Sequence, residues 1–364
     1  MTIRLVKQTP LYLQIANILK KQIEKGLIKP KESIPSLDNI SQNFGVSMIT
    51  ARQAMRVLID EEMLYVVAGK GTFVAEKPYK IINLGIMVGL QKDLIKEEPS
   101  LEIPHLVHFK EWMDFLSFSA SETNSTLVNI PSSLGEDKMM NFIETNKISG
   151  IIFLAIGDLE EEILNLIKEK NIPYIVVGEV YNRKDINFVT FNNYIGAFKA
   201  AQYLVDKGHK RIAILIGTQT YYGYQERLKG YKDALTQNKI PSKDILIIDT
   251  EPGVKGGYLA TKELLSKKAI PTAILCSSDF KAFGAIRAIK EKGMKIPEEI
   301  AIVGYDDLIF SSKGDLLLTT VRIPKEKMVQ EGLQILIDSI LKKPVPVDRL
   351  QKEIEPELIV RKTA

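Results

Sequence analysis

Eight short apolar runs, separated by windows of helical periodicity, constrain the fold of residues 83–364 more than any other feature of the chain. The runs are 82–89, 150–156, 174–179, 187–192, 211–217, 245–249, 272–278 and 301–307, and the helical windows are 110–122, 136–146, 160–170, 194–207, 224–238, 256–267, 280–292 and 326–342. Continuous apolar strands that alternate with amphipathic helices are typical of parallel sheets covered on both faces. Because about 280 residues exceed one comfortable core, we expect an α/β domain of two lobes.

Polar residues follow four of these runs, at the point where each predicted strand ends. They are Glu179, Asn192–Asn193, Ser277–Ser278–Asp279 and Asp306–Asp307. Each of them could simply cap the helix that follows. However, the carboxyl ends of parallel strands share one edge of a sheet, and ligands of such domains bind beyond that edge, between the lobes. Four polar strand ends in corresponding places therefore favour a common ligand pocket.

The first 76 residues have a different pattern, which predicts helices followed by a hairpin. Apolar residues at three- and four-residue spacing predict a helix over 11–25. Ser36 and Ser47 are the expected N-caps of two short helices joined by a turn at Gly45. This arrangement is typical of a helix-turn-helix unit, whose second helix enters the major groove of DNA. Apolar segments on either side of Ala-Gly-Lys-Gly predict a hairpin. The alternative is a small helical subdomain without a ligand.

The charge is uneven along the chain. The whole sequence has a formal net charge of +4, from 49 basic and 45 acidic residues. Residues 1–80 hold 12 Lys and Arg against 7 Asp and Glu, whereas the remaining 284 residues hold 37 against 38. A basic small domain beside a neutral large one indicates an anionic partner for the small domain, and nucleic acid is the usual candidate.

Several function classes find no support in the sequence. No apolar stretch has the roughly 18 residues that a membrane helix needs, and the N-terminus has no pattern of a secretory signal. The single cysteine, Cys276, and the pair His105 and His108 are too few for a metal site. The glycine-rich pieces lack the spacing of a phosphate-binding loop, and no catalytic constellation stands at the strand ends. We therefore expect a cytoplasmic protein without a metal, a cofactor or an enzymatic activity.

Residues 1–76, which are called the head below, resemble a known family of DNA-binding domains. Residues 34–74 read IPSLDNISQNFGVSMITARQAMRVLIDEEMLYVVAGKGTFV, and this run is similar to the winged helix-turn-helix domain of the GntR regulators, with GKGTFV intact. The resemblance implies double-stranded operator DNA as a partner and implies DNA contacts by Ser36, Ser47, Thr50, Arg52, Gly69 and Lys70. Met48 and Asp38 stand where the family commonly has arginine. Because an arginine–guanine contact contributes about 1–3 kcal/mol of discrimination, the operator of relatives cannot be transferred to this chain.

Residues 83–364, which are called the body below, resemble a second family. The runs YLVDKGHKRIAILIG, QERLKGYKDAL, PTAILCSSDFKAFGAIRAIKEKGMKIPEEIAIVGYDD, LTTVRIP and PELIVRK are similar to the effector domain of LacI-type repressors, which has the periplasmic sugar-binding fold. The resemblance implies a sugar-like ligand held by Arg227, Asp279 and Asp306, with Ser278, Asn193 and Glu179 in the same cleft. The segment 91–109 matches poorly, so the first lobe's share of the pocket is not predicted. The hinge helix of that family is also absent.

A GntR-type head on a LacI-type body is similar to the domain order of the arabinose-repressor family. The expected domains are a DNA-binding domain at 1–76, a linker at 77–82 and an effector domain at 83–364. We expect the first lobe at about 83–190 and 320–345, and the second at about 191–319 and 346–364. The implied function is a dimeric repressor of carbohydrate genes that a small effector controls. The alternative is a solute-binding protein of a transport system. Neither the effector nor the sign of its action follows from the sequence.

Overall fold

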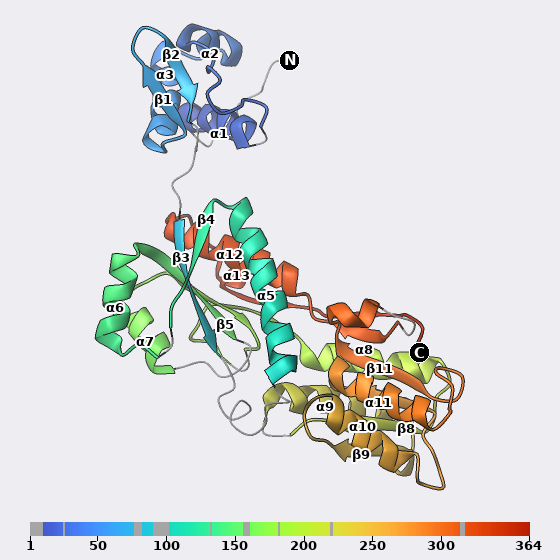
Figure 1. Ribbon diagram of the computed structural model, residues 1–364. Coiled ribbons are helices and arrows are strands. Elements are labelled where there is room, and N and C mark those ends of the chain that lie inside the picture. Colours follow the sequence, from blue (N-terminus) through green and yellow to red (C-terminus); the bar gives the residue numbers. More distant parts are fainter. Residues whose placement is uncertain are drawn as a thin grey trace. The chain divides into compact units, whose positions relative to one another are not determined.

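The computed structural model describes two compact units, which are treated separately below. The described residues are 10–24, 26–75, 82–89, 102–131, 133–155, 161–180, 183–218, 221–313 and 317–364. Figure 1 labels their helices and strands. The expected linker at 77–82 lies outside the described residues except for Ile82, which begins a strand.

The head contains three helices and a two-stranded hairpin. The helices are α1 (Leu11–Glu24), α2 (Leu37–Phe44) and α3 (Met48–Asp60), and the strands are β1 (Leu64–Val67) and β2 (Gly71–Val74). Gly45 ends α2 with a φ of 63°, a left-handed conformation that glycine adopts without strain. Ile15, Ala51 and Leu58 are fully buried in one apolar cluster, so the three helices share a core. The predicted helix-turn-helix and hairpin are thus present.

The first lobe of the body is a six-stranded sheet with the order β13-β7-β6-β5-β3-β4. Its strands are β3 (Ile82–Gly89), β4 (Ser125–Asn129), β5 (Ile148–Ala155), β6 (Tyr174–Gly178), β7 (Phe188–Phe191) and β13 (Gln351–Ile354). The helices α5 (Glu102–Glu122) and α12 (Lys325–Ile340) pack together beside this sheet, whereas α6 (Glu136–Thr145) and α7 (Glu161–Glu169) join a core on its other face. Helices therefore cover both faces of the sheet, as the apolar runs predict.

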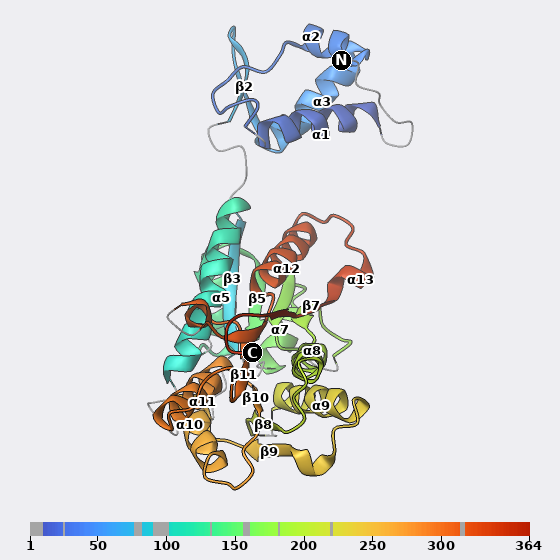
Figure 2. The same cartoon turned by 90° about the vertical axis from the view of Figure 1, so that its right-hand side faces the viewer.

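The second lobe is built in the same way. Its sheet has the order β14-β12-β11-β10-β8-β9, in which only β14 is antiparallel to its neighbour. The strands are β8 (Ile212–Ile216), β9 (Ile245–Asp249), β10 (Ala273–Cys276), β11 (Ala301–Asp306), β12 (Thr319–Arg322) and β14 (Glu357–Ile359). Figure 2 shows α8 (Asn193–Asp206) and α9 (Tyr222–Gln237) on one face of this sheet, and α10 (Gly253–Leu264) and α11 (Asp279–Glu291) on the other. All five residues of β8 are buried because both faces are covered.

The chain crosses between the two sheets three times, and these crossings correct the expected lobe limits. We placed 320–345 in the first lobe and 346–364 in the second, but β12 pairs with β11 in the second sheet and β13 pairs with β7 in the first. The helix α12 between them does belong to the first lobe. The strand β13 reads Gln-Lys-Glu-Ile and buries only Ile354, so hydropathy carried no signal for an edge strand held by backbone hydrogen bonds.

Candidate functional site

The guanidinium group of Arg227 is the centre of a polar cluster in the body. Arg227 lies on α9 and is buried, and its Nε donates to Asn193 Oδ1 at 2.6 Å. Its Nη1 donates to the carbonyl oxygen of Ser277 at 2.6 Å, and its Nη2 donates to Glu179 Oε1 at 3.2 Å. The group also lies over the ring of Tyr305, 3.9 Å from the ring centroid. Residues from three of the predicted strand ends, Glu179, Asn193 and Ser277, therefore meet at one cation.

Asp306 supplies the second charged group of the cluster. It ends β11, and its Oδ1 lies 3.7 Å from Nη1 of Arg227. Asp306 has a φ of 115°, and Asp307 beside it has a φ of 50°. Residues other than glycine rarely adopt such angles, which cost of order 1–3 kcal/mol and cluster at functional sites. The backbone at the end of β11 is thus held in a conformation that the surrounding contacts must maintain.

The charges of the cluster stabilise one another. Burial by itself would raise the pKa of Asp306, but the charge and hydrogen bond of His108 and the charge of Arg227 outweigh burial, and the pKa is lowered. Burial would likewise lower the pKa of Arg227, and the carboxylates of Asp306 and Glu179 instead raise it. Both groups are therefore ionised at neutral pH, although both are buried. Such an ionised pair presents donors and acceptors for hydroxyl groups.

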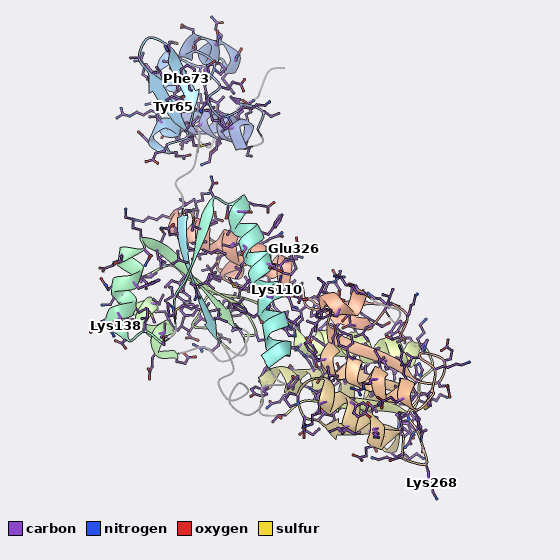
Figure 3. All side chains as sticks on the ribbon, in the orientation of Figure 1. Tyr65, Phe73, Lys110, Lys138, Lys268 and Glu326 are labelled. Atoms are coloured by element: carbon purple, nitrogen blue, oxygen red, sulfur yellow. The ribbon has the colours of Figure 1, made fainter. Side chains whose placement is uncertain are left out.

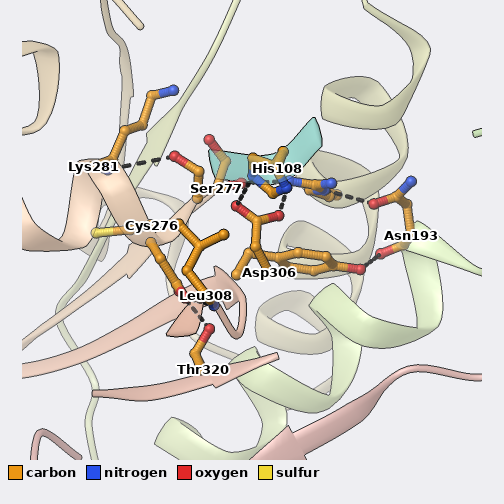
Figure 4. Close-up of polar contacts among 12 residues, drawn as sticks. His108, Asn193, Cys276, Ser277, Lys281, Asp306, Leu308 and Thr320 are labelled. Carbon is orange, nitrogen blue, oxygen red and sulfur yellow. Dashed lines mark hydrogen bonds and ion pairs between the residues drawn. The ribbon is translucent and has the colours of Figure 1, made fainter. Parts of the chain in front are cut away.

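His108 connects this cluster to the first lobe. It lies on α5, and its Nε2 is 3.3 Å from Oδ2 of Asp306. Figure 4 marks this contact with a dashed line. One turn further along α5, Oε1 of Glu111 accepts from the backbone N–H of Ile309 at 2.9 Å. The other oxygen of Glu111 accepts from Nζ of Lys325 at the start of α12. One face of α5 therefore fastens the first lobe to the end of β11 and the turn after it.

His108 was not among the residues that we predicted to bind a ligand. The reason is that its segment, 91–109, matches the family poorly and its partner Asp306 comes from the other lobe. One sequence feature could have indicated it: His108 and Glu111 are at positions i and i+3, which places both side chains on one face of a helix. The side chain of His105 lies outside the described residues.

Asp279 has a different environment from the other predicted ligand residues. Its carboxylate is fully buried and accepts from Leu308 N at 2.9 Å, Ser311 Oγ at 2.5 Å and Thr320 Oγ1 at 2.5 Å. Burial and the charge of Asp306 raise its pKa. The three donors lie in the turn after β11 and on β12, so Asp279 holds together the backbone that carries Asp306.

Ser278 caps the helix that contains Asp279. Its Oγ accepts from the backbone N–H of Lys281 at 3.4 Å, and it is the N-cap of α11. The structure thus brings Arg227, Asp306, Asn193 and Glu179 together, places Ser278 at the adjacent turn and occupies Asp279 with internal contacts. Within the described residues, no group of three or more His, Cys, Asp and Glu side chains has the arrangement of a metal site.

In the head, the predicted DNA-contacting residues lie on two helix starts and one hairpin tip. Ser36 Oγ accepts from Asn39 N at 3.2 Å, and Ser47 Oγ accepts from Thr50 N at 3.2 Å and contacts Thr50 Oγ1 at 2.9 Å. The two serines are therefore N-caps, whatever else they contact. Arg52 on α3 is exposed, one turn after the exposed apolar residues Met48 and Ile49.

The hairpin presents its charge at an exposed tip. Lys70 is exposed between Gly69 and Gly71, whose φ values are 73° and 119°. On the hairpin itself, the rings of Tyr65 and Phe73 stack at a centroid distance of 5.8 Å. Figure 3 labels both residues on the head. This cross-strand pair stabilises a two-stranded ribbon that would be marginal by itself. A rigid hairpin can therefore hold Lys70 at a defined place.

The chain matches two family models. Residues 11–74 match bacterial regulatory proteins of the gntR family, and residues 201–364 match a periplasmic binding protein-like domain. No helix among the described residues is long and apolar enough to cross a membrane. The two matches cover the head and the part of the body that contains Arg227, Asp279 and Asp306.

Two curated relatives and one solved structure are similar to this chain. The chain is 29% identical to the arabinose metabolism transcriptional repressor of Geobacillus stearothermophilus, over 98% of both chains. It is 31% identical to the probable HTH-type transcriptional repressor ExuR of Bacillus subtilis, over 61% of this chain and 67% of that protein. A LacI family transcriptional regulator from Enterococcus faecium with bound ribose shares the fold, with a TM-score of 0.61 and 21% identity, over 77% of this chain and 98% of that chain.

Proposed function

Because this chain belongs to the gntR family of bacterial transcriptional regulators, with a periplasmic binding protein-like domain as its body, we propose that a sugar-like effector controls its binding to operator DNA. In this proposal the chain represses genes of carbohydrate uptake or utilisation. The cluster around Arg227 and Asp306 is the observation that carries the proposal. The cluster combines an ionised guanidinium group, an ionised carboxylate and a contact from the first lobe. The same chain carries a helix-turn-helix head.

The effector would bind beyond the carboxyl ends of β6 and β7 in the first sheet and of β8, β10 and β11 in the second. Arg227, Asp306, Asn193 and Glu179 would hydrogen-bond its hydroxyl groups, because carboxylate and amide oxygens accept and guanidinium N–H groups donate. Asp279 and Ser278 would act mainly by holding the end of β11 and the start of α11 in place. Among similar proteins, a LacI family regulator has been solved with bound ribose, which supports a sugar as the effector class.

The head would bind operator DNA through α3 and the hairpin. Arg52 would reach base edges or phosphates in the major groove, and Ser36, Ser47 and Thr50 would contact phosphates around the helix starts. Lys70, with Gly69, would contact the minor groove or its phosphates at the hairpin tip. Two heads on one homodimer would bind a roughly palindromic operator.

The signal would pass through the first lobe. Asp306 is shared between Arg227 of the second lobe and His108 of the first, so an effector hydroxyl that binds Asp306 competes with or adds to the His108 contact. The effector therefore has a different affinity for body conformations that differ in this contact, which is the requirement for a conformational switch. The strand β3 follows the 77–82 segment directly and would transmit the change toward the head.

One experiment separates this function from the solute-binding alternative. The full chain is titrated onto labelled genomic fragments in fluorescence anisotropy, with and without a panel of pentoses, hexoses and their derivatives. We expect one fragment to bind in the nanomolar range at physiological salt and one sugar to change that affinity at least tenfold. A chain that binds a sugar but discriminates among no DNA fragments would favour the solute-binding function instead.

A further inference from the structure

Three cationic side chains are buried in or next to the candidate effector site, and two of them have carboxylate partners. Arg227 is 5% exposed and pairs with Asp306 and Glu179, and Lys325 is 4% exposed and pairs with Glu111. Lys281 on α11 is only 1% exposed. Among the described residues, the contact of its Nζ is the ring of Tyr224 and not a carboxylate. A buried ammonium group without an acceptor is costly, so a partner is expected at this point.

The ring of Tyr224 connects Lys281 with Arg227. Nζ of Lys281 lies 5.0 Å from the centroid of this ring, and Cζ of Arg227 lies 5.6 Å from the same centroid. Tyr224 packs against Gly217, which follows β8, since a Cβ at Gly217 would lie 2.3 Å from the ring. The strands β8 and β10 are neighbours, and Lys281 follows β10 at the start of α11. Lys281 therefore lies at the same sheet edge as the effector cluster.

The turn before Lys281 contains a second donor without a partner. The hydroxyl group of Ser277 is buried and makes no hydrogen bond within the described structure, although the carbonyl oxygen of the same residue accepts from Arg227. Figure 4 shows Ser277 and Lys281 on either side of the turn that leads into α11. Ser278 caps the N–H of Lys281, and the first turn of α11 presents its other backbone N–H groups and the positive end of the helix dipole. Donors and positive charge thus lie near this turn, whose own carboxylate, that of Asp279, is already occupied by Leu308, Ser311 and Thr320.

The position of Lys281 is fixed by close helix packing. A Cβ at Gly257 of α10 would lie 2.1 Å from the carbonyl oxygen of Lys281, so only glycine permits this approach. Its side chain therefore starts from a rigid backbone, and the choice of a lysine rather than an apolar residue at a buried position calls for a charged partner.

We propose that Lys281 selects an effector that carries a negative charge, namely a sugar with a carboxylate or a phosphate group. The ammonium of Lys281, the hydroxyl of Ser277 and the first N–H groups of α11 bind the anion, and the Arg227–Asp306 cluster binds the hydroxyl groups of the same molecule. This inference rests on the proposed effector function and names its ligand class. Arg227 does not serve as the anion site, because its charge is already paired with the carboxylates of Glu179 and Asp306.

The test measures sugar affinity for the full chain by calorimetry at constant ionic strength. Each pentose or hexose is offered in three forms with the same ring: neutral, as the uronate and as the phosphate ester. We expect a charged form to bind at least tenfold more tightly than its neutral form, and the two charged arms identify which anion is preferred. In Lys281→Met this preference should fall below threefold while the affinity for the neutral form stays unchanged.

Two further variants keep the test decisive. Lys281→Arg keeps the charge and should keep the preference, even if Lys281→Met folds poorly. Lys262→Met removes another lysine that lies over a tyrosine ring, at 5.6 Å from the Tyr258 centroid, but on the exposed part of α10, and should change nothing. Equal binding of neutral and charged sugars by the unmodified chain would overturn this inference and leave the sugar-effector function standing. If no sugar of any form binds, the proposed effector class itself is wrong.

Discussion

Nε2 of His108 lies 3.3 Å from Oδ2 of Asp306, so a residue of the first lobe holds the carboxylate that ends a central strand of the second. This contact lowers the pKa of Asp306 against the effect of its burial. The pair gives the body a connection that a bound effector can strengthen or replace.

Removal of the imidazole should change the pH dependence of effector binding. The folded pKa of Asp306 is below its ordinary value of 3.8, so its ionic stabilisation is present above pH 3.8 and is lost as the pH falls through the lower folded value. In His108→Ala the pKa of Asp306 should rise, because burial is then opposed by Arg227 and Lys325 without the histidine. Effector binding should therefore weaken at a higher pH than in the unmodified chain. Titrations between pH 4 and 8, followed by the fluorescence of Trp112, would show this shift, and overlapping profiles would contradict it.

Asp306→Asn should weaken the effector by roughly ten- to a few hundredfold. The substitution removes a buried acceptor charge and leaves Arg227 with fewer partners, which costs about 1–3 kcal/mol or more. The affinity for operator DNA without effector should hardly change, since the head is a separate unit. Asp249→Asn is the matched control, because Asp249 ends the edge strand β9 of the same sheet and is exposed. Calorimetry that finds reduced stability with unchanged effector affinity would assign Asp306 a purely structural role.

Arg52→Ala should weaken specific DNA binding at least tenfold and leave the fold and effector binding unchanged. Arg52 is exposed near the start of α3, where a recognition helix contacts base edges. Arg56→Ala removes the same charge one turn later, where the arginine lies 4.0 Å from Asp60, and should cost less. Fluorescence anisotropy at matched salt would compare the two. Equal losses in both variants would indicate a general charge effect instead of a specific contact.

Lys70→Ala should weaken specific and non-specific DNA binding alike. A single phosphate or minor-groove contact lowers the slope of log K against log salt by about one unit. Lys21→Ala on α1 removes an equally exposed charge outside the recognition helix and hairpin, and should leave the slope unchanged. An effect of Lys70→Ala on only one operator sequence would show that this lysine reads bases.

The single thiol should report on the integrity of the second lobe. Cys276 ends β10, is fully buried, and its pKa is raised by burial. Because thiolates are the reactive form, a thiol reagent at pH 8 should label native chain at least a hundredfold more slowly than chain in denaturant. A bound effector should slow the reaction further, since ligands stabilise the folded state. Fast labelling of the native chain would mean that the lobe opens readily.

The two domain types and most secondary structure could be predicted, because they depend on local patterns. Apolar runs with helical windows between them determine parallel sheets covered on both faces, and caps such as Ser36 and Ser47 determine where the helices of the head begin. The strands β4, β12, β13 and β14 were not among the predicted runs, since backbone hydrogen bonds to a neighbouring strand need no hydropathic pattern.

In the candidate site, too, some features follow from the sequence and others from the tertiary structure. The sequence by itself determined that Glu179, Asn193 and Asp306 follow predicted strands and that Arg227 lies in a predicted helix, and the family resemblance grouped them in one cleft. Only the tertiary structure decided that His108 contacts Asp306 and that the carboxylate of Asp279 is occupied by donors from the turn after β11 and from β12. It also decided that Lys281 is buried over the ring of Tyr224, with no ion pair among the described residues. The physical reason is that a local sequence pattern determines on which strand or helix a residue lies. Its burial, charge state and partners depend instead on segments that fold against it from distant parts of the chain.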